Sequence, residues 1–203
     1  MGSEKMRQLT ALSDLFKRVL DYCRPRSVAV LGVAGGNGLE RIESKITKRI
    51  VALDINPQYL DAVQKRFATL PGLELHCADS NSEQLHISRR NWCTLRRFSN
   101  TPNCAITSTM LYLWSCQEAR LSIVLQLASE LEQSVAVTEY SSMQTLKEHF
   151  ALINVGEFCR LLEQKGFHLL ERLNQSPPGG KGLWLGIFGR TTINRSSSLN
   201  CTF

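Results

Sequence analysis

A cluster of glycines followed by an acid has the residue types and spacing of a site for a nucleoside-containing ligand. The glycines lie between residues 32 and 38, and Asp54 follows about 20 residues further on. A glycine turn lets a ligand approach the backbone without meeting a Cβ. The N–H groups at a helix start attract polar or anionic groups. A carboxylate at the tip of the next strand can accept hydrogen bonds from ribose hydroxyls. The pattern therefore predicts a cofactor site.

The segments that flank the glycines and Asp54 predict the strands and helices that must position them. Two apolar runs, residues 28–31 and 50–53, predict strands. Between them, Asn37 and Glu40 fit the capping pair of a short amphipathic helix, with apolar residues on one face: Leu39, Ile42 and Ile46. An N-cap and a first-turn proline predict a further helix after Asp54: Asn56 and Pro57. The stretch thus predicts strand, glycine turn, helix, strand, acid and helix.

This stretch resembles class I S-adenosylmethionine-dependent methyltransferases. Their first motif is an acid, an apolar residue and then G-x-G-x-G, and it corresponds to residues 30–36 here. Gly32 and Gly36 match the outer glycines, while Ala34 takes the middle position. Val30 stands where the family often has an acid that reaches the methionine end of the cofactor. The resemblance implies a Rossmann-like fold that binds S-adenosylmethionine.

Two later segments extend the resemblance. Residues 51–57, VALDINP, are similar to the second motif, which implies that Asp54 binds the ribose hydroxyls and Ile55 packs on the adenine. Residues 73–79 look like a third strand ending on an acid, and in the family that acid faces the adenine amino group. The resemblance implies these cofactor-binding residues: Gly32, Val33, Ala34, Gly36, Asp54, Ile55, Asp79 and Ser80.

A nicotinamide-dependent oxidoreductase is the alternative for such a glycine turn. Its fingerprint, G-x-G-x-x-G, would require glycines where this sequence has Ala34 and Asn37, and no other register restores it. Any doubly wound protein also needs tight turns, so the glycines alone indicate little. The order of glycines, Asp54 and Asp79 is what favours the methyltransferase interpretation. The expected function is methyl transfer to an unidentified small-molecule acceptor, and no catalytic residue is singled out.

Composition indicates one globular domain. The chain has 203 residues, of which 43% are hydrophobic and 21% charged. No apolar run has the length needed to cross a membrane, and residues 1–16 lack a signal-peptide core, so a cytoplasmic protein is expected. The seven cysteines include no C-x-x-C pair and are odd in number. They are predicted to be free thiols, without a disulfide framework or a metal site.

The chain order predicts an α/β fold, namely a Rossmann-like seven-stranded, mostly parallel sheet with an antiparallel last strand and helices on both faces. This domain is assigned to residues 27–190, after an N-terminal helix within residues 1–26 and before a disordered tail, residues 191–203. Further strands are expected at residues 121–127, 167–173 and 182–189, and a helix at residues 156–165 with three inward side chains: Phe158, Leu161 and Leu162. The short connection between the last two strands predicts a hairpin.

Residues 88–119 do not fit this pattern. Strand four and the helix after it belong here, yet the first half shows neither helical nor strand periodicity. The segment holds four arginines and one acid, Glu118, and thus half of the net charge of +6. We interpret it either as a divergent basic loop or as a segment translated out of frame. Codons compatible with residues 102–119, displaced by two bases, can encode an amphipathic helix, a short apolar stretch and Pro-Gly-Gly, and the nucleotide sequence decides between the two.

The two interpretations lead to different functions. An out-of-frame segment would place an unselected sequence at the strand-four tip, which commonly lines the methyl-transfer site in this fold. Together with Val30, this motivates a second hypothesis, a family member that binds the cofactor but is catalytically impaired. Nucleic-acid binding is not expected, because an RNA-binding surface would interleave basic residues with aromatics on a defined element.

Overall fold

The computed structural model describes residues 2–79, 92–97, 119–127, 154–176 and 182–190. Its helices are α1 (Gly2–Cys23), the 3₁₀ helix η1 (Leu39–Arg41), α2 (Pro57–Arg66) and α5 (Val155–Gln164). Its strands are β1 (Ser27–Leu31), β2 (Arg49–Asp54), β3 (Leu73–Cys77), β4 (Trp92–Arg97), β5 (Arg120–Gln126), β6 (Phe167–Gln175) and β7 (Leu183–Arg190). The expected tail, residues 191–203, and Ser80 lie outside the described residues.

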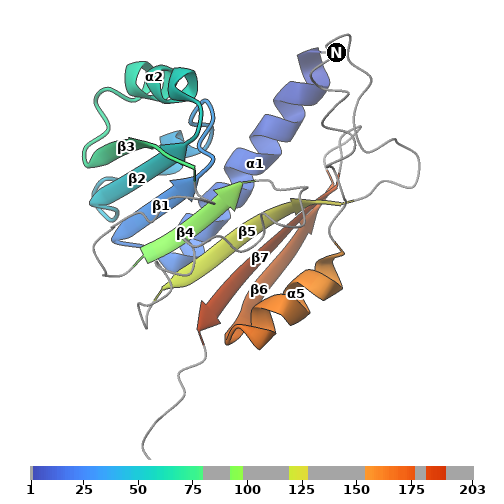
Figure 1. Ribbon diagram of the computed structural model, residues 1–203. Coiled ribbons are helices and arrows are strands. Elements are labelled where there is room, and N and C mark those ends of the chain that lie inside the picture. The colour runs from blue at the N-terminus through green and yellow to red at the C-terminus, as the bar shows by residue number, and fades with distance from the viewer. Residues whose placement is uncertain (1, 80–91, 98–118, 128–153, 177–181, 191–203) are drawn as a thin grey trace, which may run out of the picture.

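The strands form one sheet in the order β3-β2-β1-β4-β5-β7-β6 (Figure 1). β1 pairs in parallel with β2 and β4, while β3 and β5 continue the parallel pairing at either side. β7 runs antiparallel to both β5 and β6. The connection from β6 to β7 is short enough for a hairpin and too short for a crossover. The α/β class, the parallel order of the first three strands and the antiparallel last strand are therefore confirmed.

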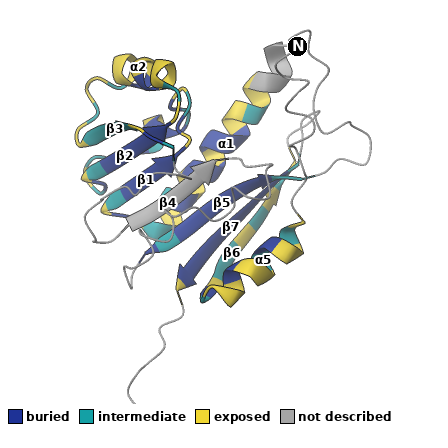
Figure 2. Cartoon of the chain, in the orientation of Figure 1, coloured by how far each residue is buried: buried dark blue, intermediate teal, exposed yellow. Residues whose placement is uncertain are grey.

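Helices cover both faces of the sheet, as expected (Figure 1). One face packs against α1 and α2 in a core that includes Leu15, Val28, Ile50 and Val63. The other face packs against α5, where Phe158 and Phe188 meet edge-on with ring centroids 6.3 Å apart. Figure 2 shows the consequence, since β1, β2, β5 and β7 are largely buried while the outer side of α5 is exposed.

The first helix packs along the sheet through an apolar side. Phe16 and Val19 are buried, and the helix extends past the carboxyl ends of the strands (Figure 1). Nη2 of Arg18 in α1 lies 3.3 Å from Oε1 of Glu171 in β6, so the first helix and the sixth strand are joined across 153 positions. The helix is a packing element along most of its length.

The predicted helix after the glycines is wrong. Only η1 forms there, because Gly38 adopts a left-handed conformation (φ 98°) and Ile42 is already extended. Asn37 does not cap it, since its side-chain amide donates to the carbonyl oxygen of Leu9 at 2.8 Å. Ile42 instead packs into the α1 core. Tertiary contacts with α1 thus override a short helical pattern that could not nucleate by itself.

The other helix starts follow the sequence signals. Asn56 caps α2 by accepting the Gln58 N–H at 3.0 Å, with Pro57 as the first helical residue. In α5, Phe158 and Leu162 face inward as expected. Leu161 does not, because 39% of it is exposed. Positions 158 and 162 are one turn apart and share a face, which leaves position 161 at its margin.

β4 forms in a segment whose sequence predicts no strand. Its backbone pairs Leu31 of β1 with Arg96, and Arg96 with Ile123 of β5. β1 and β5 are buried strands, and the slot between them would otherwise leave two rows of backbone N–H and C=O groups without partners. A strand in this place gives those groups hydrogen-bond partners, which accounts for β4 even though its side chains do not follow a strand pattern. The rest of residues 88–118 lies outside the described residues.

Candidate cofactor-binding site

The glycine loop leaves β1 at the carboxyl ends of the strands. Its conformation is left-handed at Gly32 (φ 70°), Ala34 (φ 48°), Gly36 (φ 75°) and Gly38 (φ 98°). The N–H groups of Gly32 and Val33 both donate to the carbonyl oxygen of Leu53 at 2.9 Å. These bonds hold the loop beside the tip of β2, at the edge where open α/β sheets bind their ligands.

Asp54 joins the loop to the start of α2. Its Oδ2 accepts the Ala34 N–H at 2.8 Å and its Oδ1 accepts the Asn56 N–H at 3.0 Å. The residue is 8% exposed. An ionised carboxylate has about four acceptor positions, so two remain for hydroxyl donors. A buried carboxylate fixed in this way suits a ribose.

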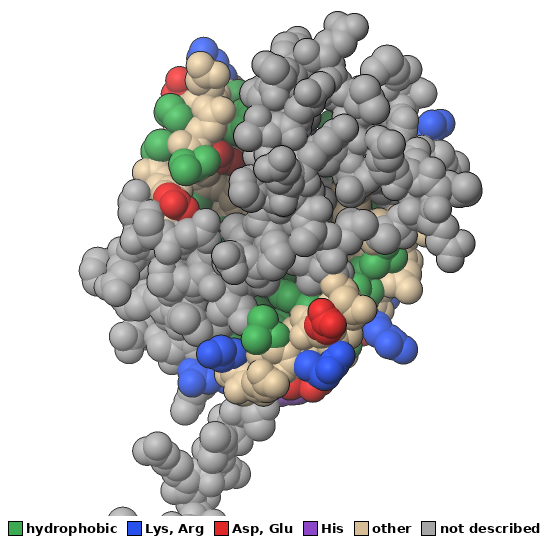
Figure 3. All heavy atoms as spheres, turned by 45° about the vertical axis from the view of Figure 1, so that its right-hand side comes forward, with side chains coloured by type: hydrophobic (Ala, Val, Ile, Leu, Met, Phe, Trp, Pro, Cys, Tyr) green, Lys and Arg blue, Asp and Glu red, His purple; other side chains and the backbone are tan. Residues whose placement is uncertain are grey.

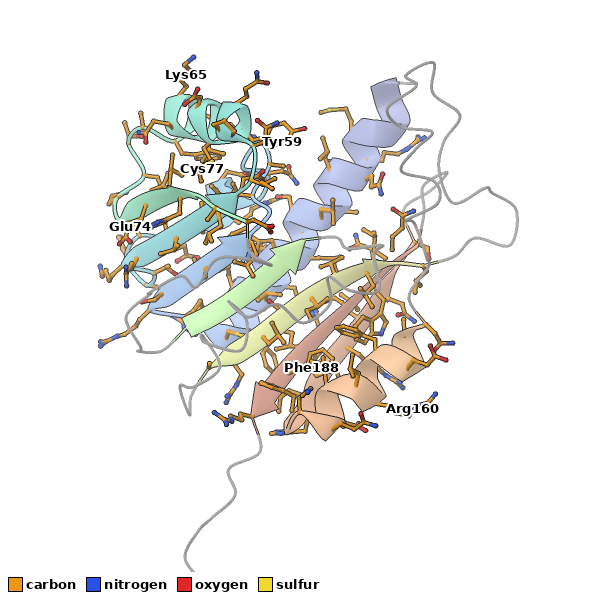
Figure 4. The ribbon with its side chains drawn as sticks, viewed as in Figure 1. Tyr59, Lys65, Glu74, Cys77, Arg160 and Phe188 are labelled. Carbon is orange, nitrogen blue, oxygen red and sulfur yellow. The ribbon has the colours of Figure 1, made fainter. Side chains whose placement is uncertain are left out.

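An apolar surface lies next to that carboxylate. Ile55 is 68% exposed and Tyr59 of α2 is 47% exposed. Cys77 ends β3 at the same side of the sheet, and its Sγ donates to the carbonyl oxygen of Ile55 at 3.6 Å. In Figure 4, Tyr59 lies on α2 and Cys77 lies below that helix, at the end of β3. Exposed apolar side chains at a strand tip offer a face for a planar ring such as a nucleobase.

The third predicted segment reaches the same place. The Ala78 N–H donates to the backbone carbonyl oxygen of Asp54 at 3.1 Å, so Asp79 follows directly beside the β2 tip and is half-buried. The structure thus brings together the loop, Asp54, Ile55 and Asp79. Val33 contributes only its backbone, because its side chain is 2% exposed and belongs to the α1 core.

Two neighbouring glycines have different reasons to be glycine. A Cβ on Gly35 would meet nothing within 4 Å, and within the described part of the chain its N–H has no acceptor. A Cβ on Gly36 would lie 2.7 Å from Cε2 of Phe67 and 3.1 Å from Cγ2 of Val63. Gly36 therefore accommodates α2, and Gly35 presents open backbone. The open backbone, the buried carboxylate and the exposed apolar face fit a nucleoside cofactor.

Arg66 is a loop contact that the motif did not indicate. Its Nη1 donates to the carbonyl oxygen of Gly35 at 3.2 Å, and its Nη2 lies 3.5 Å from Oε2 of Glu40. The guanidinium also lies over the Phe67 ring, 4.9 Å from the centroid. In the sequence Arg66 is an ordinary basic residue at a helix end, and only the folded chain places it against the glycines.

A hollow elsewhere on the molecule is distinct from this site. It has a volume of about 90 Å³ and lies where α1 leads into β1 and where the chain enters β2. Its lining is Leu20, Asp21, Arg24, Pro25, Arg41, Glu43, Ile46 and Thr47. This is the amino end of the strands, opposite the glycine loop. Its lining includes neither the glycine loop nor Asp54.

Within the described ranges, no group of three His, Cys, Asp or Glu residues is placed to hold a metal ion. Of the described cysteines, Cys77 and Cys159 form no disulfide bond. None of the described helices has both the length and the apolar character that crossing a membrane requires.

The sequence matches no protein-family model and no curated protein. Solved structures do match. A Burkholderia thailandensis 1,6-didemethyltoxoflavin-N1-methyltransferase with bound S-adenosylhomocysteine has a TM-score of 0.67 at 14% identity, over 94% of this chain and 82% of that one. Magnesium protoporphyrin IX methyltransferase from Synechocystis has a TM-score of 0.62 at 10% identity, over 93% and 85%. The N-methyltransferase NodS from Bradyrhizobium japonicum has a TM-score of 0.60 at 12% identity, over 93% and 97%.

These structures share a fold with the chain. It has the Rossmann-like α/β fold of S-adenosylmethionine-dependent methyltransferases. The resemblance drawn from the motifs is therefore confirmed at the level of the fold.

Proposed function

We propose that the protein binds S-adenosylmethionine and transfers its methyl group to a small organic acceptor. The observation that carries the proposal is the buried Asp54 carboxylate, which is bonded to the left-handed glycine loop beside the exposed Ile55. The proposal includes the full seven-stranded domain and assigns the cofactor to the predicted residues: Gly32, Val33, Ala34, Gly36, Asp54, Ile55, Asp79 and Ser80.

In this proposal the chain contributes binding and orientation. S-adenosylmethionine, when bound, supplies a methyl group that is already activated for transfer. Asp54 accepts the ribose hydroxyls on its remaining lone pairs, and Ile55 covers one face of the adenine. The Gly35 backbone offers an N–H without a side chain in the way. Holding two reactants in line accounts for much of the acceleration of such a reaction, so no acid or base is required of the described residues.

Calorimetric titration with S-adenosylhomocysteine tests the proposal. We expect saturable one-to-one binding by the purified chain. Asp54→Asn keeps the shape of the side chain but removes its charge and half its acceptors, and it should weaken binding by about 1–3 kcal/mol. Asp61→Asn is the matched control, because Asp61 is an exposed acid on α2. Equal affinity of the wild type and Asp54→Asn, with both chains folded, would contradict the role of Asp54.

The same titration separates the nicotinamide alternative. NADH serves as the second ligand, because its ribose also needs an acid at a strand tip. Saturable binding of NADH without binding of S-adenosylhomocysteine would contradict the proposal and favour a nicotinamide-dependent oxidoreductase.

A cofactor-binding but impaired protein is the second candidate function. It is favoured by β4, which lies in the middle of the sheet and carries the sequence WCTLRR where buried parallel strands are usually a continuous apolar run. Val30, at the family's acid position, is 5% exposed and packs in the α1 core. Methyl transfer from S-adenosylmethionine to any acceptor in a turnover assay would remove this candidate.

A small-molecule acceptor is proposed over a nucleic acid. The solved structures with this fold include small-molecule enzymes and a candidate RNA methyltransferase from Pyrococcus horikoshii. On the face shown in Figure 3, Lys and Arg side chains at the lower edge lie among Asp and Glu side chains. A nucleic-acid site would present a run of basic residues without acidic ones along a groove. The described side chains on this face show no such arrangement.

A further inference from the structure

Glu40 holds the outer side of the glycine loop. Its Oε2 accepts the Gly38 N–H at 2.9 Å, and its Oε1 accepts the Ser13 hydroxyl of α1 at 2.8 Å. Arg66 of α2 lies 3.5 Å from the same Oε2. One carboxylate thus contacts α1, the loop and α2, three elements that are far apart in the sequence.

The contact with α1 is built on a buried hydroxyl. Ser13 is 3% exposed, and its Oγ both donates to Glu40 and accepts from Nε of Arg41 at 2.9 Å. Arg41 in turn lies 2.9 Å from Oδ1 of Asp14. A buried hydroxyl that both donates and accepts in this way fixes the carboxylate it bonds. The position of Glu40 is therefore set by α1 as well as by its own short helix.

The contact with α2 continues to the open part of the loop. Arg66 bonds the Gly35 carbonyl oxygen at 3.2 Å while it pairs with Glu40. Gly38 is in turn pressed on α1, since a Cβ there would lie 3.0 Å from Cδ1 of Phe16. The backbone between Gly35 and Gly38 is consequently held both from α1 and from α2.

We propose that Glu40 is a positioning residue for the cofactor loop: it fixes the Gly35–Gly38 backbone in its binding conformation by bonding the Gly38 N–H, Ser13 and Arg66. The part of the proposal that concerns the cofactor rests on the proposed function. The part that concerns the loop conformation stands independently.

The charge of Glu40 agrees with this role. Burial raises the pKa of Glu40, but the backbone N–H groups of Glu40 and Gly38, the Ser13 hydroxyl and the charge of Arg66 outweigh it, and the pKa lies below its ordinary value. Arg41 and Asp14 are the other charged groups beside this network. A lowered pKa means that the contribution of Glu40 is complete above its unfolded-state pKa and is lost as the pH falls through the folded-state pKa.

Amide hydrogen exchange tests the loop conformation directly. In Glu40→Ala we expect the Gly38 N–H to exchange at least about tenfold faster, because a hydrogen bond to a charged acceptor is lost. The Ala34 N–H is the internal control, since Asp54 holds it without Glu40. Glu40→Gln should restore slow exchange at Gly38, because an amide oxygen can still accept that N–H. Glu43→Ala is the matched control, at an exposed acid three positions on.

The outcomes are separable. Unchanged exchange at Gly38 in Glu40→Ala would overturn the proposal, and so would an equal rise at Gly38 and Ala34, which would indicate general loosening of the fold. For the cofactor, Glu40→Ala should weaken S-adenosylhomocysteine binding about tenfold, with recovery in Glu40→Gln.

Equal affinity of the wild type and Glu40→Ala, with faster Gly38 exchange, would overturn the cofactor part alone. No binding by the wild type would instead remove the proposed function, and the exchange data would still decide the loop part.

Discussion

Ala34 is the residue in the loop whose type fits its backbone least well. It has a left-handed conformation (φ 48°), which costs a residue with a Cβ about 1–2 kcal/mol. The Asp54 carboxylate holds it there through the Ala34 N–H at 2.8 Å. The strain is thus maintained by the same acid that we assign to the ribose.

Ala34→Gly should stabilise the fold. Glycine adopts this conformation without strain, although it also has a larger conformational entropy in the unfolded chain. The relief of strain outweighs that entropy cost, so the free energy of unfolding should rise by about 0.5–1 kcal/mol. Urea unfolding measures the change. Ala62→Gly is the control, because Ala62 is exposed in the middle of α2 and its replacement should destabilise by about 1 kcal/mol. A loss of stability in both variants would show that the Ala34 conformation is not strained.

At this scale the sequence indicated Asp54, Ile55 and Asn56 correctly as neighbours at a strand tip, because their positions are fixed by local chain geometry. It did not indicate why Gly36 is a glycine, since the side chain that fills its place, Phe67, is 31 positions away. The sequence also could not indicate the hydrogen bond between Glu40 and Ser13, because Ser13 is 27 positions away. Contacts made by the folded chain have no local pattern.

At the scale of the elements, the turn before β3 is tightly constrained. Gly72 has φ 74°, and a Cβ there would collide with the carbonyl oxygen of Lys48. Its own carbonyl oxygen accepts the Ile50 N–H at 2.8 Å, which sets the entry of β3 beside β2.

Gly72→Ala should destabilise the protein by roughly 2–3 kcal/mol, because the new methyl group meets backbone that cannot move without breaking the strand pairing. Gly166→Ala has the same left-handed strain (φ 81°) but open space around the Cβ. It should cost only about 1 kcal/mol. Thermal unfolding of the two variants compares them, and equal losses would show that the collision at Gly72 is relieved.

The elements were predictable where side-chain pattern and backbone pairing agree. The runs at β1, β2, β5 and β7 are apolar and buried, and each was expected close to where it lies. The helix expected after Asn37 failed because Gly38 and the contacts of α1 hold that segment in another conformation. β4 could not be read from its side chains, because the pairing of its backbone with two buried strands determines it.

For the whole molecule, the central place of β4 separates the two interpretations of residues 88–119. Residues in register lie on the same face of a sheet, and the row of residue 96 contains Leu31 and Ile123, which are 1% and 3% exposed. A segment selected for this slot would have an apolar residue in that row.

Arg96→Val should therefore raise the free energy of unfolding by about 1–3 kcal/mol if residues 88–119 are an unselected sequence. Arg160→Val is the control, because Arg160 lies on α5 and its side chain is directed away from the sheet (Figure 4). Urea unfolding measures both. Destabilisation by Arg96→Val would instead indicate that the arginine is used, and it would support the divergent basic loop.

The core beneath α1 has a consequence for the order in which a ribosome delivers this chain. Phe16 and Val19 belong to the same core as Leu183, Leu185 and Ile187 of β7, which follow them by more than 160 positions. The apolar side of α1 therefore stays incompletely covered until β7 has been synthesised. A message that shifted frame near residue 88 and never returned would lack β5 and β7, and its first helix would remain a target for chaperones and proteases.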